Sequence, residues 1–284
     1  MRAKLFIASC ALAAMVWAAP NARAAHFLAN RDAGHQTANT ALPLPAQFRL
    51  ERERGLVLRV WIDSRGPYTF VVDTGAGLNV IADRVVSELR LPTNTIRPTI
   101  IGGLTTSRTT SSREAVISRL DVGSPGNRLP QQQTALIVSN LPLDVDGILD
   151  PTEAYAPYGY SIDLPNERIA VMSGGSINPR SRPGVDRAVV SWVRNGVDNR
   201  PFVRLGDGRL ALVDTGSRFG LAVSSRNAVI IGPNRRNQPH EVARDIGGGT
   251  IMSRRVSPTT ITIGELVLRR IPTDILFGIG KGAP

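Results

Sequence analysis

Cysteine and histidine are scarce in this sequence, and their scarcity excludes several kinds of chemistry. The 284 residues include one cysteine, Cys10, close to the N-terminus, so a disulfide framework, a catalytic cysteine and a thiolate metal site are excluded. The three histidines, His26, His35 and His240, are scattered along the chain. A zinc site or a Ser-His-Asp triad would depend on His240 nearly alone. We therefore expect no metal ion and no cofactor.

Long apolar runs are absent after the N-terminus. No stretch of 18 or more apolar residues occurs there, so we expect no transmembrane span in the mature chain. At the N-terminus, Arg2 and Lys4 precede a short apolar run, and a small-x-small pattern ends at Ala24. This arrangement predicts a signal peptide over residues 1–24. We expect an exported protein, periplasmic or secreted, of a bacterial envelope.

A lipoprotein signal is the alternative for this segment. The residues Ile-Ala-Ser-Cys that end at Cys10 have the pattern of a lipidation site. Against it, almost no apolar segment precedes Cys10, and the apolar run continues well beyond it. We therefore favour a cleaved signal peptide over a lipid anchor.

Lysine is nearly missing, although the formal net charge is +11. Only Lys4 and Lys281 are lysines, and the arginines that carry the charge are spread along the whole chain. Aromatic residues make up 5% and do not alternate with the arginines as a base-stacking surface requires. We expect a solubilising surface and no nucleic acid partner, and keep attachment to nucleic acid or to an envelope surface through the arginines as an alternative class.

The patterning is that of a β protein. The chain has 27 glycines and 20 prolines, and turn residues interrupt its apolar runs at short intervals. Residues 56–62 and 259–267 alternate or are β-branched, which predicts strands. Residues 82–91 form the best helix candidate, with Val85, Val86 and Leu89 on one side. We predict an all-β fold with minor helix.

The two parts of the sequence repeat each other. Val-Val-Asp-Thr-Gly at 71–75 is matched by Leu-Val-Asp-Thr-Gly at 212–216. The first aspartate stands 50 positions before a glycine, Gly123, and the second stands 50 positions before Gly264. A glycine group follows each motif, at 102–103 and at 247–249. We interpret this as an internal duplication.

The segments rich in glycine, proline and polar residues set the expected boundaries. Residues 25–45 have no periodicity and are expected to be a flexible lead-in. The Ser-, Gly- and Pro-rich residues 173–184 are expected to be a linker. The predicted N-terminal lobe then covers 46–172, and the predicted C-terminal lobe covers 185–284.

The paired Asp-Thr-Gly motifs suggest a chemistry. Hydrolysis of a peptide bond without a metal or a nucleophilic side chain needs a group that deprotonates water and a group that protonates the carbonyl oxygen. Two carboxyls about 3 Å apart cannot both ionise, so Asp73 and Asp214 could do both jobs with one shared proton. Each threonine could bond across beneath the pair, and each glycine lets the backbone approach closely.

These motifs resemble those of the bacterial retropepsin-like and pepsin-like aspartic peptidases, over roughly residues 46–280. The resemblance implies a bilobal fold of double-psi-type barrels, with Asp73 and Asp214 as the catalytic residues. It assigns active-site support to Thr74, Gly75, Ala76, Thr215, Gly216 and Ser217. It assigns a substrate-covering flap to Gly102 and Gly103, with Gly247 and Gly248 as the counterpart. Residues 146–149 resemble a strand that threads behind the active-site loop, and 160–164 resemble a strand that closes the lobe.

The sequence departs from the family pattern in the second lobe. Ser217 stands where the first motif has Ala76, and its hydroxyl could donate a hydrogen bond to Asp214. Arg218 comes next and is expected to face solvent. The threading glycine, Gly147, lies 74 positions after Asp73, and its counterpart would fall beyond Pro284. The second lobe therefore lacks this strand or is truncated, unless residues 276–278 replace it.

The predicted function is that of an aspartic endopeptidase, active as a monomer on a peptide or protein substrate. The alternative is a non-catalytic peptide-binding protein that retains the bilobal fold, suggested by the abbreviated second lobe. A calcium loop at 144–147 is disfavoured, because the further oxygen ligands and the closing glutamate are missing.

Overall fold

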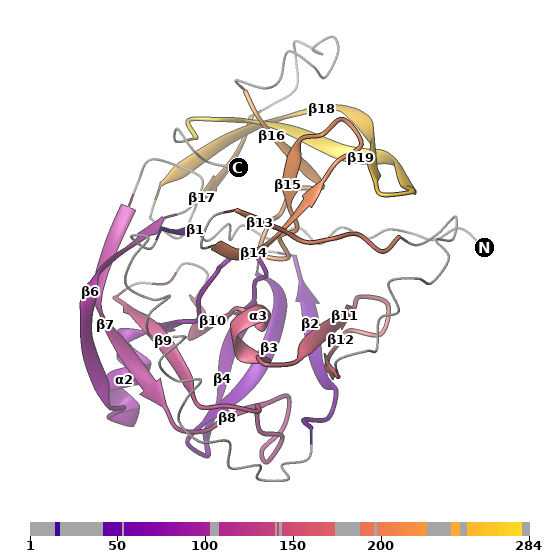
Figure 1. Ribbon diagram of the computed structural model, residues 1–284. Coiled ribbons are helices and arrows are strands. Elements are labelled where there is room, and N and C mark those ends of the chain that lie inside the picture. The colour runs from indigo at the N-terminus through magenta and orange to yellow at the C-terminus, as the bar shows by residue number, and fades with distance from the viewer. Residues whose placement is uncertain are drawn as a thin grey trace.

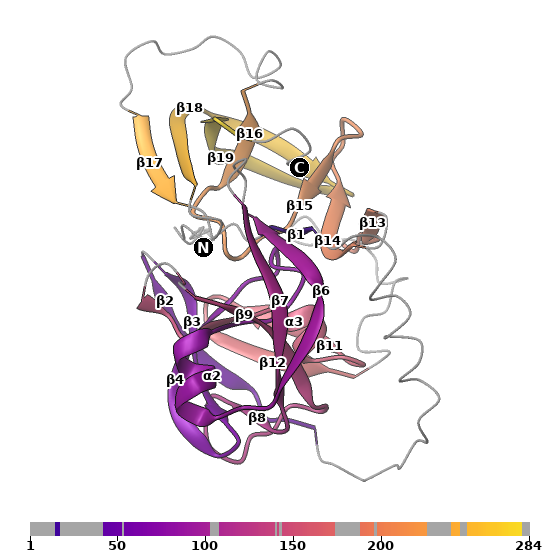
Figure 2. The same cartoon turned by 90° about the vertical axis from the view of Figure 1, so that its left-hand side faces the viewer.

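The structure is a computed structural model that describes residues 15–17, 42–52, 54–102, 108–139, 141, 144–173, 188–195, 198–225, 240–244 and 249–279. Two groups of strands lie one above the other (Figures 1 and 2). We call the described residues from 46 to 172 the N-terminal half and those from 188 to 279 the C-terminal half. Strands dominate both halves, and the described helices are short, which confirms the predicted all-β fold with minor helix.

The N-terminal half is built around one large sheet. Its strands are β2 (Ala46–Glu51), β3 (Gly55–Ile62), β4 (Arg65–Val72), β5 (Val80–Ala82), β6 (Thr93–Gly102), β7 (Arg108–Ile117), β8 (Leu120–Val122), β9 (Gln133–Val138), β10 (Gly147–Leu149), β11 (Gly159–Asp163) and β12 (Arg168–Met172). Strand β1 (Met15–Trp17), within the predicted signal peptide, pairs antiparallel with β6. The helices are α2 (Asp83–Leu89) and α3 (Pro151–Ala154).

The sheet is open, which corrects the expected barrel. Its twelve strands follow the order β1-β6-β7-β9-β5-β10-β4-β3-β2-β12-β11, with β8 paired to β3. Within the described chain, β11 pairs only with β12 and β1 only with β6, so nothing joins the two ends of the path. Strand β10 lies parallel to β4 and antiparallel to β5, which confirms the predicted threading strand.

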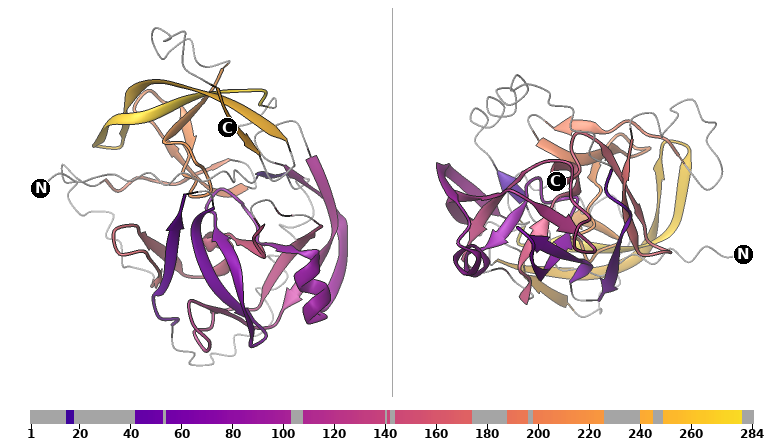
Figure 3. Two further views of the ribbon diagram at one scale, coloured as in Figure 1. Left: turned by 180° about the vertical axis from the view of Figure 1, so that it is seen from behind. Right: turned by 90° about the horizontal axis from the view of Figure 1, so that it is seen from below.

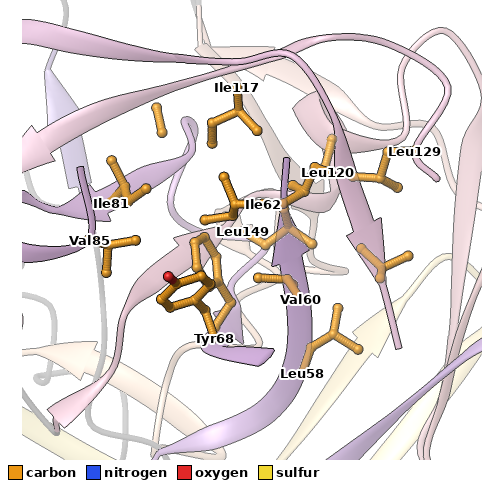
Figure 4. Close-up of a cluster of buried hydrophobic side chains, with 14 of the residues drawn as sticks. Leu58, Val60, Ile62, Tyr68, Ile81, Val85, Ile117, Leu120, Leu129 and Leu149 are labelled. Atoms are coloured by element: carbon orange, nitrogen blue, oxygen red, sulfur yellow. The ribbon is translucent and has the colours of Figure 1, made fainter. Parts of the chain in front are cut away.

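The core of the N-terminal half comes from alternating apolar residues of its central strands. Leu58, Val60 and Ile62 on β3 are fully buried and pack with Ile81 and the other labelled side chains of Figure 4. The predicted helix is present as α2, and Val85, Val86 and Leu89 are its buried residues. This amphipathic spacing explains why a short helix forms there, since its apolar side packs on the sheet.

The C-terminal half contains two smaller sheets. Its strands are β13 (Val193–Asn195), β14 (Asp198–Arg204), β15 (Leu210–Leu212), β16 (Leu221–Ser224), β17 (His240–Arg244), β18 (Thr250–Ile263) and β19 (Leu266–Phe277). One sheet has the order β13-β14-β15 and the other β16-β19-β18-β17. The β structure predicted over 259–267 is present, and Gly264, with a φ of 57°, turns the chain there and separates β18 from β19.

The proposed replacement for the threading strand was also wrong. Leu276 pairs in parallel with Ser224 of β16. Strand β5 is the equivalent of β16 in the N-terminal half. It pairs in parallel with β9 and not with β10. The end of β19 therefore has the position of β9, and the described C-terminal half contains no counterpart of β10.

Candidate functional site

The two Asp-Thr-Gly loops meet at the junction between the halves, where the ends of β4 and β15 approach each other (Figure 3). The backbone N–H of Thr74 donates to the Thr215 hydroxyl at 3.1 Å, and the N–H of Thr215 donates to the Thr74 hydroxyl at 3.0 Å. Each hydroxyl donates in turn to a carbonyl across the junction, that of Val213 at 2.6 Å and that of Val72 at 2.9 Å. Four reciprocal hydrogen bonds therefore join the loops.

The carboxyl groups above this network are held in matching ways. The N–H of Gly75 donates to Oδ1 of Asp73 at 2.8 Å, and the N–H of Gly216 donates to Oδ1 of Asp214 at 2.8 Å. A Cβ at Gly75 would lie 2.7–2.9 Å from the carboxyl atoms of Asp214, which is closer than van der Waals contact allows. Glycine at position 75 is therefore what allows Asp214 to lie against the opposite loop.

The two aspartates differ in exposure. Each carboxyl shifts the pKa of the other. Asp73 is 0% exposed, and its Oδ2 receives no hydrogen bond from an N–H or hydroxyl donor in the described chain. Asp214 is only partly buried. A proton held between the two carboxyls would satisfy the buried oxygen.

The environment raises the pKa of both aspartates. Burial raises the pKa of Asp73 well above its usual range, and the negative charge of Asp214 raises it further. Burial also raises the pKa of Asp214, to about 6, against the hydrogen bonds from Asp73 and Gly216 and the positive charge of Arg200, which lower it. The pair is thus suited to hold one proton jointly in weakly acidic solution, so that one carboxyl is an acid while the other is a base.

Ala76 and Ser217, which follow the two motif glycines, bond within their loops through backbone N–H groups. Ala76 is fully buried, and its N–H donates to the Asp73 carbonyl at 3.3 Å. The equivalent N–H of Ser217 donates to the Asp214 carbonyl at 3.4 Å. The Ser217 hydroxyl accepts from the N–H of Phe219 at 3.2 Å, and the backbone N–H of Ser217 is among the groups that lower the pKa of Asp214. The neighbouring Arg218 donates to the carbonyl of Val242 at 3.5 Å.

The predicted flap falls largely outside the described residues. Gly102 ends β6, whereas Gly103, Gly247 and Gly248 are not among the residues that the structure describes. The β6–β7 hairpin rises from the N-terminal half toward the C-terminal half (Figure 2).

Two side chains of the site were missed in the sequence. Asn79 is buried; it accepts from the N–H of Asp150 at 3.0 Å and donates to Gln133 at 3.1 Å, which ties the first loop to β9 and β10. Arg200 on β14 is 5% exposed and lies beside Gly77 of the first loop. A buried polar residue two or more positions outside a motif has no local sequence signal, so neither could be found from the pattern.

Metal ligation finds no support in the described part of the chain, which contains no group of three or more His, Cys, Asp or Glu side chains that could hold an ion. The disfavoured calcium loop is engaged otherwise, because the Asp146 carboxylate accepts from the N–H of Thr69 at 2.7 Å and pairs with Arg84 at 2.6 Å. Neither described helix has the length and apolar character to cross a membrane.

Comparison with known proteins points to the same chemistry as the geometry. Residues 58–149 match the model of the aspartyl protease family. This segment begins in β3, contains the first Asp-Thr-Gly loop and ends with the threading strand β10. No curated protein matches the chain. The match supports a peptidase of the aspartic class.

Proposed function

We propose that this protein is an aspartic endopeptidase in which Asp73 and Asp214 share one proton and activate a water molecule. The observation that carries the proposal is the reciprocal bonding of Thr74 and Thr215, which joins the two loops that carry the aspartates although they lie 141 residues apart in the chain. Two such carboxyls need no metal ion or cofactor for hydrolysis. The two halves would then be lobes that bind an extended peptide between them.

The reaction would follow from the shared proton. One carboxylate takes a proton from water as the water oxygen bonds to the peptide carbonyl carbon, and the protonated carboxyl gives its proton to the carbonyl oxygen. The resulting diol collapses as the C–N bond breaks: one diol hydroxyl gives its proton to the carboxylate as it becomes the new carbonyl, and the other carboxyl gives its proton to the leaving nitrogen. One water is consumed for each bond cleaved, and the pair returns to its starting state.

The β6–β7 hairpin would supply the backbone surface for substrate. In the full chain β1 occupies an edge of β6, with Val16 opposite Ile101. An extended peptide can pair with an edge strand in the same way. Removal of the predicted signal peptide would free this edge.

The test is the Asp73→Asn and Asp214→Asn variants of the chain from Ala25 onward. Each should lower kcat/KM on a denatured-protein substrate between pH 3 and 8 by about 10²–10⁴-fold, because an amide cannot exchange the proton. Asp207→Asn is the matched control, since Asp207 is exposed and pairs with Arg209. Full activity in either site variant would refute the proposal. A folded wild-type chain that binds peptides and cleaves none would favour the peptide-binding alternative.

A further inference from the structure

The two loops have different neighbours at one corresponding position. Val71, two places before Asp73, pairs with Val57 on β3. Leu212, two places before Asp214, pairs with Phe202 on β14. Gly55 stands two residues before Val57, and Arg200 stands two residues before Phe202. Where the first half has a buried glycine with a φ of 84°, the second half therefore has a long cationic side chain.

The Arg200 side chain is fixed among neighbours at the junction. It is 5% exposed, and its guanidinium carbon lies 5.5 Å from the centre of the Phe202 ring. The Trp192 indole N–H donates to the Arg200 carbonyl at 2.5 Å. A Cβ at Gly77 would lie 3.4 Å from Cγ and 3.5 Å from Cδ of Arg200. The side chain thus crosses from β14 to the first Asp-Thr-Gly loop.

This position brings the Arg200 side chain to the loop against which the Asp214 carboxyl lies. The Asp214 carboxyl lies against Gly75, and Arg200 lies against Gly77, two residues further along the same loop. The positive charge of Arg200 lowers the pKa of Asp214, whereas the charge of Asp150, which follows β10, raises that of Asp73. Arg218 donates to Val242 on β17 and is directed elsewhere. Two charges on different elements therefore act on the pair in opposite directions.

We propose that Arg200 is a positioning residue that keeps the negative charge of the pair on Asp214 and leaves the shared proton on Asp73. The inference rests on the proposed function and adds the direction of the first step. Asp214 is then the base that takes the proton of water, and Asp73 is the acid that protonates the carbonyl oxygen. A guanidinium suits this task because it stays protonated throughout the acidic range.

The first test is the pH dependence of kcat/KM for Arg200→Met, Arg200→Lys and Arg204→Met. Without the cation the pair ionises less readily, so the acidic limb in Arg200→Met should move to higher pH by about one unit, the lower end of what an adjacent opposite charge does to a carboxyl. Arg200→Lys keeps the charge and should move the limb less. Arg204 is exposed on the same strand, so Arg204→Met, which removes an equal charge, should leave the limb in place.

The second test reads the carboxyls directly and needs no cleavage. Aspartate labelled with ¹³C at Cγ gives NMR signals whose shifts follow ionisation, and the signals of the pair are assigned by their loss in Asp73→Asn and Asp214→Asn. The first ionisation of the pair should occur at higher pH in Arg200→Met than in the wild type and in Arg204→Met. Arg200→Gln, which keeps hydrogen-bonding capacity without charge, replaces the methionine variant if circular dichroism shows that the latter is unfolded.

The outcomes separate this inference from the peptidase proposal. An unchanged titration in the neutral variants overturns the role of Arg200, even if the wild type cleaves peptides. A shifted titration in a chain that cleaves nothing supports the role of Arg200 and removes the peptidase proposal. An equal shift in Arg204→Met would mean that net charge, and not the buried position, controls the pair, and would also overturn the inference.

Discussion

The N-terminal and C-terminal halves hold their aspartates in the same way but surround them differently. The glycine N–H bonds to Oδ1 are 2.8 Å in both loops, and the threonine bonds are reciprocal. Yet Val72, which precedes the first aspartate, is 0% exposed, whereas the equivalent Val213 is 45% exposed. A short motif at the end of a strand is therefore enough to set the geometry of each loop, and it does not determine how deeply the loop is buried.

The difference in burial follows from one strand. In the N-terminal half β10 covers β4, with Ile148 opposite Val71, and the Leu149 carbonyl accepts the N–H of Asp73 at 3.0 Å. In the C-terminal half β15 is an edge strand of its sheet in the part of the chain that the structure describes. Because a carboxyl without a covering strand keeps some contact with water, the two aspartates experience unequal desolvation even before Arg200 acts.

The largest effect should come from the feature that the halves share. Thr74→Val leaves the N–H of Thr215 without its acceptor and the Val213 carbonyl without that donor, and Thr215→Val does the same to the opposite loop. Each variant should lower the free energy of unfolding by about 2–3 kcal/mol, the cost of leaving buried polar groups unsatisfied. Urea unfolding followed by circular dichroism measures both.

The matched controls keep the hydroxyl. Thr74→Ser and Thr215→Ser preserve all four bonds and should cost less than the valine variants. The double valine variant should cost less than the sum of the single variants, since the loops separate as a unit once one side is lost. A Thr74→Val protein as stable as the wild type would mean that the cross-bonds do not join the halves.

The shared features are also the ones that could be predicted from sequence. The duplicated Asp-Thr-Gly motif, the equal spacing to Gly123 and Gly264, and the helix at 83–89 are local or repeated patterns. They identify the two aspartates, the supporting threonines and the all-β class, because such patterns depend on neighbours within a few residues.

The features that distinguish the halves could not be predicted, because they depend on contacts between distant segments. Nothing near Arg200 in sequence marks it among the other arginines, and one of its neighbours, Gly77, lies more than a hundred residues away in the chain. The open ends of the sheet likewise depend on which distant strands pair.

The second prediction concerns the unequal pKa values of the two aspartates. In the unfolded chain both titrate near pH 4, whereas in the folded chain the pKa of Asp214 is about 6 and that of Asp73 lies well above its usual range. Below pH 4 both aspartates are protonated in the folded and in the unfolded chain, so their contribution to the free energy of unfolding is complete there. As the pH rises from 4 through 6, the unfolded state loses protons that the folded state keeps, and stability should fall by up to about 1.4 kcal/mol per pH unit for each such proton.

The aspartate variants identify the source of that slope. Asp73→Asn should flatten the dependence of the unfolding free energy on pH more than Asp214→Asn, because the more deeply buried carboxyl is the more strongly shifted. Carboxyls with a lowered pKa, such as Asp121, contribute with the opposite sign but equally in every variant, so they cancel in the differences. Chemical unfolding at pH 4, 5, 6 and 7 gives the slopes, and parallel curves for wild type and both variants would contradict the prediction.

The smallest expected effect belongs to the pair Val72→Ala and Val213→Ala, which tests the absence of a counterpart of β10 beside β15 in the described chain. Both residues keep the backbone carbonyl that accepts a threonine hydroxyl, so only side-chain burial differs. Val72→Ala removes two fully buried methyl groups and should cost about 2 kcal/mol of unfolding free energy. Val213→Ala should change it by less than about 0.5 kcal/mol, as expected at an exposed site. Equal losses would mean that in solution Val213 is covered as Val72 is by β10, and that the two halves are more alike than their described strands indicate.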